Sequence, residues 1–430
     1  MVGEAIFKQS VVKAALWFLL PVLAASCMEF YVARIWSAGQ PPQFGDLYAP
    51  WWGAHELFLH NRNPYSPPVA REIQTVIYGA PQPAGYRGEP SELAGGFAYP
   101  LYAAFLLWPT VHLAFSTVQT VFLYASLSAT AGSLLLWLLA FHFRPPPAQL
   151  VALALLTLGS FPVLQGIRLQ NLSLIAAGFL AATLVLITTG HLTLAGTMLA
   201  ASTFKPQFTI VLVPWLALWT LGDWRRRQSL AWSFLAFLLL LAASAEWLMP
   251  GWVGGFLRVV AAYRQYTFGH SLLDVWFTLR GGPIAAVALL FVVFALCWPY
   301  RHHSVNSPAT FVAISLMLAA TLVVIPTLAP HTQLLLLPGF LCLLRYRGWL
   351  RAQRFARPAL LAVWLLLAWP WIAATGLTLA AGLFPLGVLL RWRELPLYTS
   401  PVLPLAVLIA LSFLIRSRTW PDQDFGSSSD

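Results

Sequence analysis

Charged residues are scarce in this sequence. Asp, Glu, Lys and Arg make up 9% of its 430 residues, whereas soluble domains contain about 25%. Only three cysteines are present. Each lies in an apolar stretch without the paired spacing of a zinc site or a disulfide framework. The shortage of charge excludes a soluble globular protein, and the cysteines predict no redox or structural metal role.

Long apolar runs fill most of the chain, since 59% of the residues are hydrophobic. Runs of about 20 residues match the hydrocarbon core of a bilayer, so we expect a polytopic all-α membrane protein with about 12 transmembrane helices, within a range of about 11 to 13. The first is a retained helix that follows Lys13, with a cleaved signal peptide as the alternative. The other expected spans are 97–115, 117–142, 150–165, 172–189, 192–221, 230–249, 283–300, 308–328, 332–344, 358–379 and 401–415.

The formal net charge of +11 is distributed in a way that indicates membrane topology. Arginines gather in three short segments, each after an apolar run, and the positive-inside rule places such segments in the cytoplasm. We therefore predict a multi-pass protein of the cell membrane with no nucleic acid partner. The three segments are 225–227, 345–357 and 416–418.

Two polar segments are expected on the extracytoplasmic face. The segment 34–96 is a large first loop that holds five of the 14 carboxylates, and 250–282 is a second loop. Within the first loop, apolar residues at helical spacing predict a short interfacial helix with Asp46 at its N-terminus. We treat 1–420 as a single transmembrane domain and expect 421–430 to be a disordered tail.

Five short motifs follow one another along the chain. They are Gly45-Asp46-Leu47 with Trp51, Asn63-Pro64-Tyr65, Phe97-Ala98-Tyr99-Pro100, Lys205-Pro206 and Asp223-Trp224-Arg225-Arg226-Arg227. Their order resembles that of glycosyltransferase family 87, which belongs to the GT-C superfamily. The resemblance implies a GT-C-like fold and a mannosyltransferase that uses a polyprenyl-phosphate-linked sugar. It further implies a glycolipid or glycan acceptor, inversion at the sugar carbon, and an active site on the extracytoplasmic face.

Asp46 is the candidate catalytic base. The resemblance implies this role, because family members use a carboxylate of the first external loop as the general base. The residue alone leaves a second reading open, since Asp is also a favoured N-cap of a helix. Glu29 and Glu246 are rival bases, although pairing with a nearby arginine or with headgroups is the favoured explanation for both.

Lys205 is the only lysine after residue 13, and it stands in an apolar segment immediately before a proline. A charge in such a segment is costly, so a functional role is the default hypothesis. We expect Lys205 to bind the donor phosphate and to stabilise the leaving group. A lysine that snorkels to the interface or pairs with a carboxylate is the alternative.

Other polar residues are weaker candidates. Arg264, His270, Arg280 and His331 are possible ligands of the donor phosphate, or else interfacial anchors. Possible sugar or acceptor contacts, with aromatic belts and helix caps as the alternatives, are Trp51, Tyr65, Tyr99, Arg168, Gln170 and Asn171. The sequence shows no acidic cluster suited to a metal, so we assign no metal ligand and no cofactor.

A transporter or flippase for lipid-linked sugars is the alternative function, and an inactive scaffold subunit is a third. A transporter predicts polar groups at the midplane of corresponding spans. Here the ionisable residues concentrate at the predicted outer ends and loops, which favours the enzyme.

Overall fold

The computed structural model describes residues 18–39, 45–81, 93, 95–266, 270–325 and 329–417, with the side chains of 263–266 excepted. All regular secondary structure in these ranges is helical, which confirms the all-α prediction. The predicted tail 421–430 lies outside the described residues.

Five described helices are long and apolar enough to cross a membrane, and a bent pair makes a possible sixth. The protein is therefore a helical membrane protein, but the expected count of about 12 spans is not confirmed. The five are Phe18–Trp36 with a π-helical end at Tyr31–Trp36, α5 (Phe115–Ala140), α12 (Trp224–Leu248), α14 (Leu272–Cys297) continued by η3 (Trp298–His302), and α18 (Ala356–Ala380). The pair bent by 50° is α6 (Pro147–Leu158) with α7 (Phe161–Leu169).

Prolines interrupt several of the expected spans, because proline lacks an N–H and clashes with the preceding turn. The stretch 97–115 holds only the short α4 and η2 before α5 begins, and 192–221 is divided at Pro206 into separate helices. These segments are α4 (Ala103–Leu107), η2 (Trp108–Thr110), α9 (Leu192–Ser202), α10 (Pro206–Thr209), α11 (Leu212–Gly222), η4 (Pro330–Leu336) and α16 (Leu337–Arg345).

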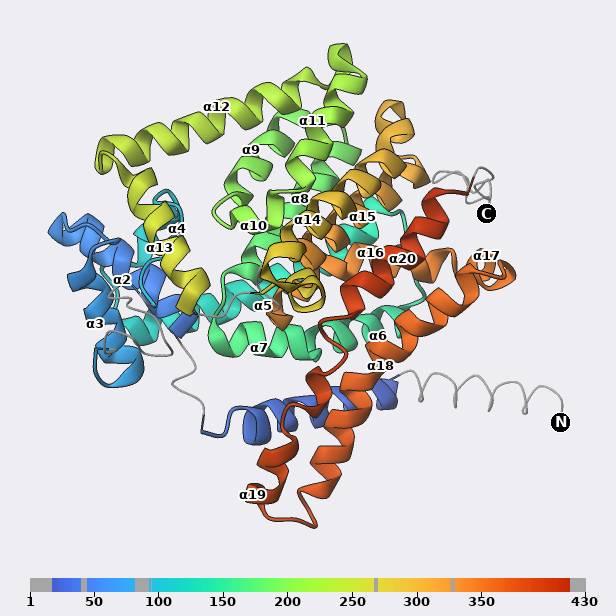
Figure 1. Cartoon of the computed structure of the whole chain (residues 1–430), viewed down its shortest axis with the longest axis horizontal. Helices are drawn as coiled ribbons and strands as arrows, with labels where there is room; N and C mark the ends of the chain where they lie inside the picture. Colours follow the sequence, from blue (N-terminus) through green and yellow to red (C-terminus); the bar gives the residue numbers. More distant parts are fainter. Residues whose placement is uncertain are drawn as a thin grey trace.

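The centre of the bundle is α15 (Pro308–Val324), which is buried along nearly its whole length. It packs against α11, α14, α16 and α20 (Leu403–Ile415) (Figure 1). A helix that is apolar on every side is stable where it avoids water, either among other helices or in lipid, and α15 is enclosed by other helices. The remaining helices are α8 (Ser173–Thr188), α17 (Arg347–Ala352), α19 (Leu386–Leu389), η5 (Leu390–Trp392) and η6 (Leu395–Leu397).

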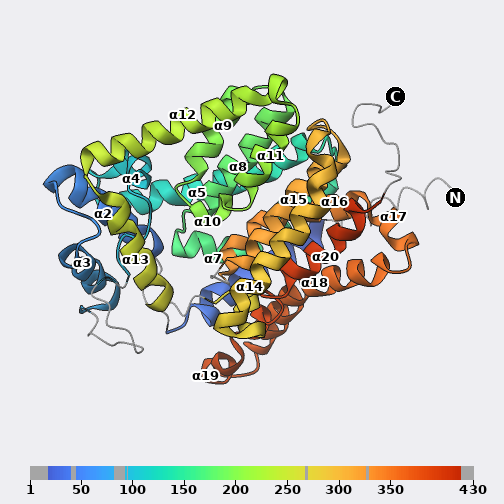
Figure 2. The same ribbon diagram turned by 45° about the horizontal axis from the view of Figure 1, so that its top comes forward.

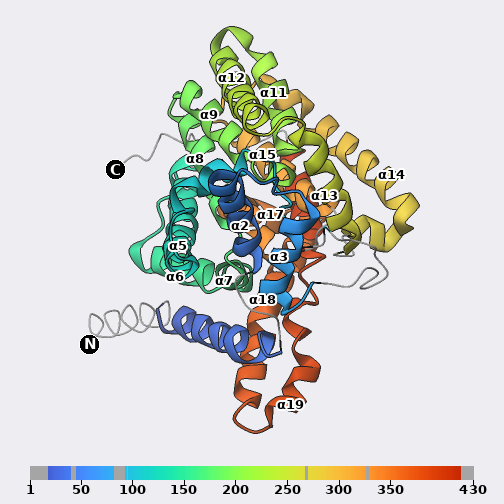
Figure 3. The ribbon, with the colours of Figure 1, turned by 90° about the vertical axis from the view of Figure 1, so that its left-hand side faces the viewer.

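The two predicted external segments lie side by side. The segment 34–96 forms α2 (Gly45–His60) and α3 (Pro67–Tyr78), which pack together, and 250–282 is largely helical through α13 (Trp252–Tyr266) and the start of α14. Figures 2 and 3 show α13 beside α2 and α3, and the ring of Tyr65 lies close to Gly255. The two segments are therefore neighbours in the fold, and their placement on the extracytoplasmic face stays a prediction.

We expect Gly196→Ala to destabilise the protein by about 1–3 kcal/mol, because overpacking displaces neighbouring backbone. Gly196 of α9 faces α12, and an added Cβ would lie 2.5 Å from the carbonyl oxygen of Leu230 and 2.8 Å from the backbone nitrogen of Phe234. Thermal unfolding of the detergent-purified protein measures the effect.

Gly132→Ala is the matched control, since Gly132 also lies inside a helix but an added Cβ meets nothing within 4 Å. Equal melting temperatures for the two variants would contradict the close packing of α9 against α12 at Gly196.

Candidate active site

Asp46, Asn171 and Lys205 form a continuous chain of hydrogen bonds. Asn171 Nδ2 donates to Asp46 Oδ2 over 2.6 Å, and Lys205 Nζ donates to Asn171 Oδ1 over 2.6 Å. Lys205 Nζ also donates to Ser173 Oγ over 2.6 Å. The carboxylate and the ammonium group are thus joined through a single amide.

Each of these residues stands where a helix begins or breaks. Asp46 is in the first turn of α2, Asn171 occupies the turn between α7 and α8, and Lys205 lies between α9 and α10. The turn at Asn171 is possible because Gln170 adopts left-handed backbone angles, with φ 51° and ψ 43°, which end α7. Helix ends expose unpaired backbone groups, so polar side chains that gather there cost less than in a continuous apolar helix.

Ser173 sets the orientation of the Asn171 amide. Its backbone N–H and its hydroxyl both donate to Asn171 Oδ1, over 2.9 and 2.6 Å. The oxygen of the amide therefore faces Lys205 and Ser173, and its NH₂ group must face Asp46. Asp46 and Lys205 are held in this way without direct contact.

Charge and burial act on Asp46 in opposite directions. Burial raises the pKa of Asp46 above its ordinary value, while the hydrogen bond from Asn171 and the positive charge of Lys205 lower it in part. The side chain of Lys205 is buried, with the residue 4% exposed. A base with a raised pKa accepts protons more readily than an ordinary surface aspartate, provided that it remains ionised.

Aromatic rings surround the ammonium group of Lys205. The centroid of the Tyr99 ring is 5.8 Å from Nζ and that of Phe208 is 5.7 Å away, within the range of cation–π attraction. Tyr99 is held in turn by the Tyr65 hydroxyl, which donates to its carbonyl oxygen over 2.8 Å. The Phe97-Ala98-Tyr99-Pro100 motif thus contributes one wall around Lys205.

His331 lies near this cluster in a neutral form. Burial and the charge of Lys205 lower the pKa of His331 to about 3. Its backbone N–H donates to Gln165 Oε1 over 3.1 Å, while the buried Nδ1 atom has no hydrogen-bond partner. His331 can therefore offer a neutral hydrogen bond to a ligand, but it supplies no positive charge at neutral pH.

The other three candidate phosphate ligands are not part of the cluster around Lys205 as the structure describes it. His270 and Arg280 line a different pocket of about 440 Å³ together with Asp274. The side chain of Arg264 is outside the part of the chain that the structure describes. The structure therefore brings neither His270 nor Arg280 into hydrogen-bond contact with Lys205.

Arg168 and Gln170 line another pocket, of about 380 Å³. Arg168 pairs with Glu29 over 2.8 Å, and Gln170 donates to the carbonyl oxygen of Gln119 over 2.8 Å. This pairing occupies Glu29, one of the two rival bases. Glu246, the other, accepts the backbone N–H of Gly251 over 2.8 Å.

Trp51 and Tyr65 are packed inside the protein, with exposures of 5% and 4%. Trp51 Nε1 donates to the carbonyl oxygen of Thr110. Their burial favours a packing role over the sugar contact considered for them. Tyr99, the third candidate aromatic residue, has its ring centroid 5.8 Å from Lys205 Nζ.

Ser173 and Gln165 were not identified from the sequence. Ser173 follows the candidate Asn171 by two residues, and a polar pair at the start of an apolar helix was the available signal. Gln165 lies inside α7 and contacts a residue 166 positions away, so nothing in its local sequence indicates the contact.

The chain was compared with known proteins. The sequence model of glycosyltransferase family 87 matches residues 97–326. No curated protein and no solved structure matches the chain. The matched segment includes Tyr99, Asn171 and Lys205, whereas Asp46 precedes it and His331 follows it.

Proposed function

The chain belongs to glycosyltransferase family 87, and from this premise we propose that it transfers a sugar, mannose in the first instance, from a polyprenyl-phosphate carrier. The acceptor is a hydroxyl of a glycolipid or surface glycan on the extracytoplasmic face. Membership in the family supports a membrane glycosyltransferase. The observation that carries the proposal is the chain of hydrogen bonds from Asp46 to Lys205, which supports these two residues as the groups that act on the acceptor and the leaving phosphate.

Asp46 is the general base in this proposal. The acceptor oxygen attacks the anomeric carbon, the bond from that carbon to the phosphate oxygen breaks, and the acceptor proton moves to Asp46. Attack opposite the leaving phosphate inverts the anomeric configuration. Asn171 occupies one carboxylate oxygen, Oδ2, and no described residue donates a hydrogen bond to Oδ1, which is the oxygen we assign to the acceptor.

Lys205 stabilises the departing polyprenyl phosphate. An ammonium group has three N–H donors, and Asn171 and Ser173 accept two of them. The third is available for a phosphate oxygen, where charge develops as the bond breaks. His331 adds a neutral hydrogen bond at the same end of the site.

A transfer assay tests the proposal. Purified protein in lipid vesicles is incubated with radiolabelled polyprenyl-phosphate mannose and a lipid extract of the source cells as acceptor. We expect label to move to a glycolipid or glycan with release of an equal amount of polyprenyl phosphate. Polyprenyl-phosphate glucose, a polyprenyl-phosphate pentose and a nucleotide-linked mannose are compared in parallel.

Two results would contradict the proposal. Transfer from the nucleotide-linked sugar alone would exclude the lipid donor. Movement of the labelled lipid across the vesicle membrane without any transfer would support the alternative function, a transporter or flippase for lipid-linked sugars.

A further inference from the structure

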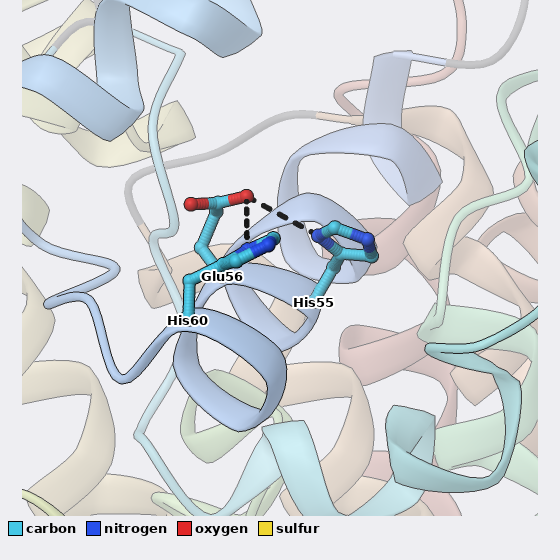
Figure 4. A group of neighbouring side chains, drawn as sticks. All are labelled: His55, Glu56 and His60. Atoms are coloured by element: carbon cyan, nitrogen blue, oxygen red, sulfur yellow. Dashed lines mark hydrogen bonds and ion pairs between the residues drawn. The ribbon is translucent and has the colours of Figure 1, made fainter.

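Three potential metal ligands converge at the C-terminal end of α2. The Nδ1 atoms of His55 and His60 lie 3.2 and 3.1 Å from the same oxygen, Oε1, of Glu56. The three ligand atoms all lie within 4.8 Å of one another, and Figure 4 shows both imidazole rings directed at that carboxylate. We propose that His55, Glu56 and His60 bind one Zn²⁺ ion, with water as the fourth ligand.

The spacing of the ligand atoms fits zinc. Zn–N and Zn–O bonds of about 2.0–2.2 Å in a tetrahedral site place neighbouring ligand atoms about 3.3–3.6 Å apart. The two distances from Oε1 are within a few tenths of an ångström of this separation. Two histidines, one carboxylate and an open fourth position also form a ligand set that zinc commonly adopts.

Neighbouring residues hold the ligands in position. Glu56 is 2% exposed, and its second oxygen, Oε2, accepts a hydrogen bond from Arg62 Nη1 over 2.5 Å. The Trp52 ring stacks on His55 with centroids 4.8 Å apart. Such outer contacts orient metal ligands and raise the affinity of metal sites.

The local charge and access also suit a cation. Arg62 additionally pairs with Glu72 over 2.6 Å, so two carboxylates and one guanidinium group leave a net formal charge of −1 around the site. Partial burial raises the pKa of Glu72, but the hydrogen bonds from Arg62 and Trp52 and the positive charge of Arg62 outweigh this effect and lower it overall. Glu72 therefore stays ionised at neutral pH. The side chain of His60 is 52% exposed, which leaves the site open to solvent.

The proposed zinc ion would lie apart from the reacting groups of the proposed sugar transfer. Asp46 and His55 are separated along α2 by nine residues, or about 14 Å at 1.5 Å per residue. An ion at this end of α2 would not reach the reacting groups at the other end. It would instead fix the end of α2 beside Arg62, whose ion pair with Glu72 connects α2 to α3.

Metal analysis of the full-length protein tests the proposal. The protein is purified with a tag that contains no histidine, stripped with a chelator, and titrated with ZnCl₂. We expect close to one zinc per chain and a higher melting temperature with zinc. His60→Ala should bind zinc at least about tenfold more weakly. Loss of a residue that only contacts a metal ligand typically lowers metal affinity by about 10- to 100-fold, and loss of a ligand itself should cost no less. Sugar transfer should be unchanged.

His191→Ala is the control, because His191 is an exposed histidine between α8 and α9, and it should retain the zinc and the thermal shift. His60→Gln keeps a hydrogen-bond donor beside Glu56 but removes the imidazole ligand. If hydrogen bonds alone explain the cluster, His60→Gln melts like the wild type and neither protein responds to zinc. That result, or equal zinc content in His60→Ala and the wild type, overturns the proposal.

Discussion

Asp46→Asn is expected to reduce sugar transfer by about 10²- to 10⁴-fold, the range that a general base contributes. The amide has nearly the same shape as the carboxylate, and its carbonyl oxygen still accepts the hydrogen bond that Asn171 donates to Oδ2. The variant therefore removes the proton acceptor while it leaves the geometry of α2 in place. The rate of transfer from radiolabelled polyprenyl-phosphate sugar measures the loss.

Glu29→Gln is the matched control for Asp46→Asn. Glu29 is the rival carboxylate, it is half exposed at 51%, and it pairs with Arg168. We expect this variant to keep near wild-type activity. Retained transfer in Asp46→Asn would exclude Asp46 as the base. The remaining role of Asp46 would then be the alternative named above, a cap at the start of α2.

The pH dependence gives a second measure of Asp46. A base acts in its deprotonated form, so kcat/KM falls as the pH drops through the pKa of that base. Burial raises the pKa of Asp46, so the acidic limb should lie above the ordinary aspartate value of about 3.9. This limb should be absent in Asp46→Asn.

The candidate residues were selected from the sequence on two different grounds. Lys205 is a lone lysine in an apolar segment, whereas Asp46 was selected as the base through the resemblance to glycosyltransferase family 87. Their connection could not be predicted. Asn171 lies 125 positions from Asp46 and 34 from Lys205. The packing of α2 against α7 and of α8 against α9 brings the three together.

The number of spans could not be derived from hydropathy for a related reason. Apolar runs mark helices that avoid water, but they do not separate a helix facing lipid from one such as α15 that other helices enclose. The proposed zinc ligands His55, Glu56 and His60 were not identified from the sequence, because the two histidines have no cysteine pair near them. His331 was expected as a possible ligand of the donor phosphate, and its burial near Lys205 keeps it neutral.

Lys205→Met is expected to lower kcat by about 10²- to 10³-fold, as loss of one group that stabilises developing negative charge typically does. Methionine fills a similar volume among Tyr99 and Phe208 without a charge. The departing phosphate then lacks its cation, so we expect the loss in kcat to exceed any change in KM. Steady-state kinetics with the polyprenyl-phosphate sugar separate the two.

The pH profile of Lys205→Met distinguishes an electrostatic role from a structural one. The positive charge of Lys205 lowers the pKa of Asp46, so its removal should shift the acidic limb of kcat/KM to higher pH. Ser173→Ala keeps the charge and removes one acceptor of the Lys205 ammonium. It should therefore cost only about 1 kcal/mol, or roughly fivefold, as one hydrogen bond does, and leave the acidic limb in place. Equal kinetics and equal profiles for both variants would mean that Lys205 serves packing alone, since a purely structural lysine has no means of moving the titration of Asp46.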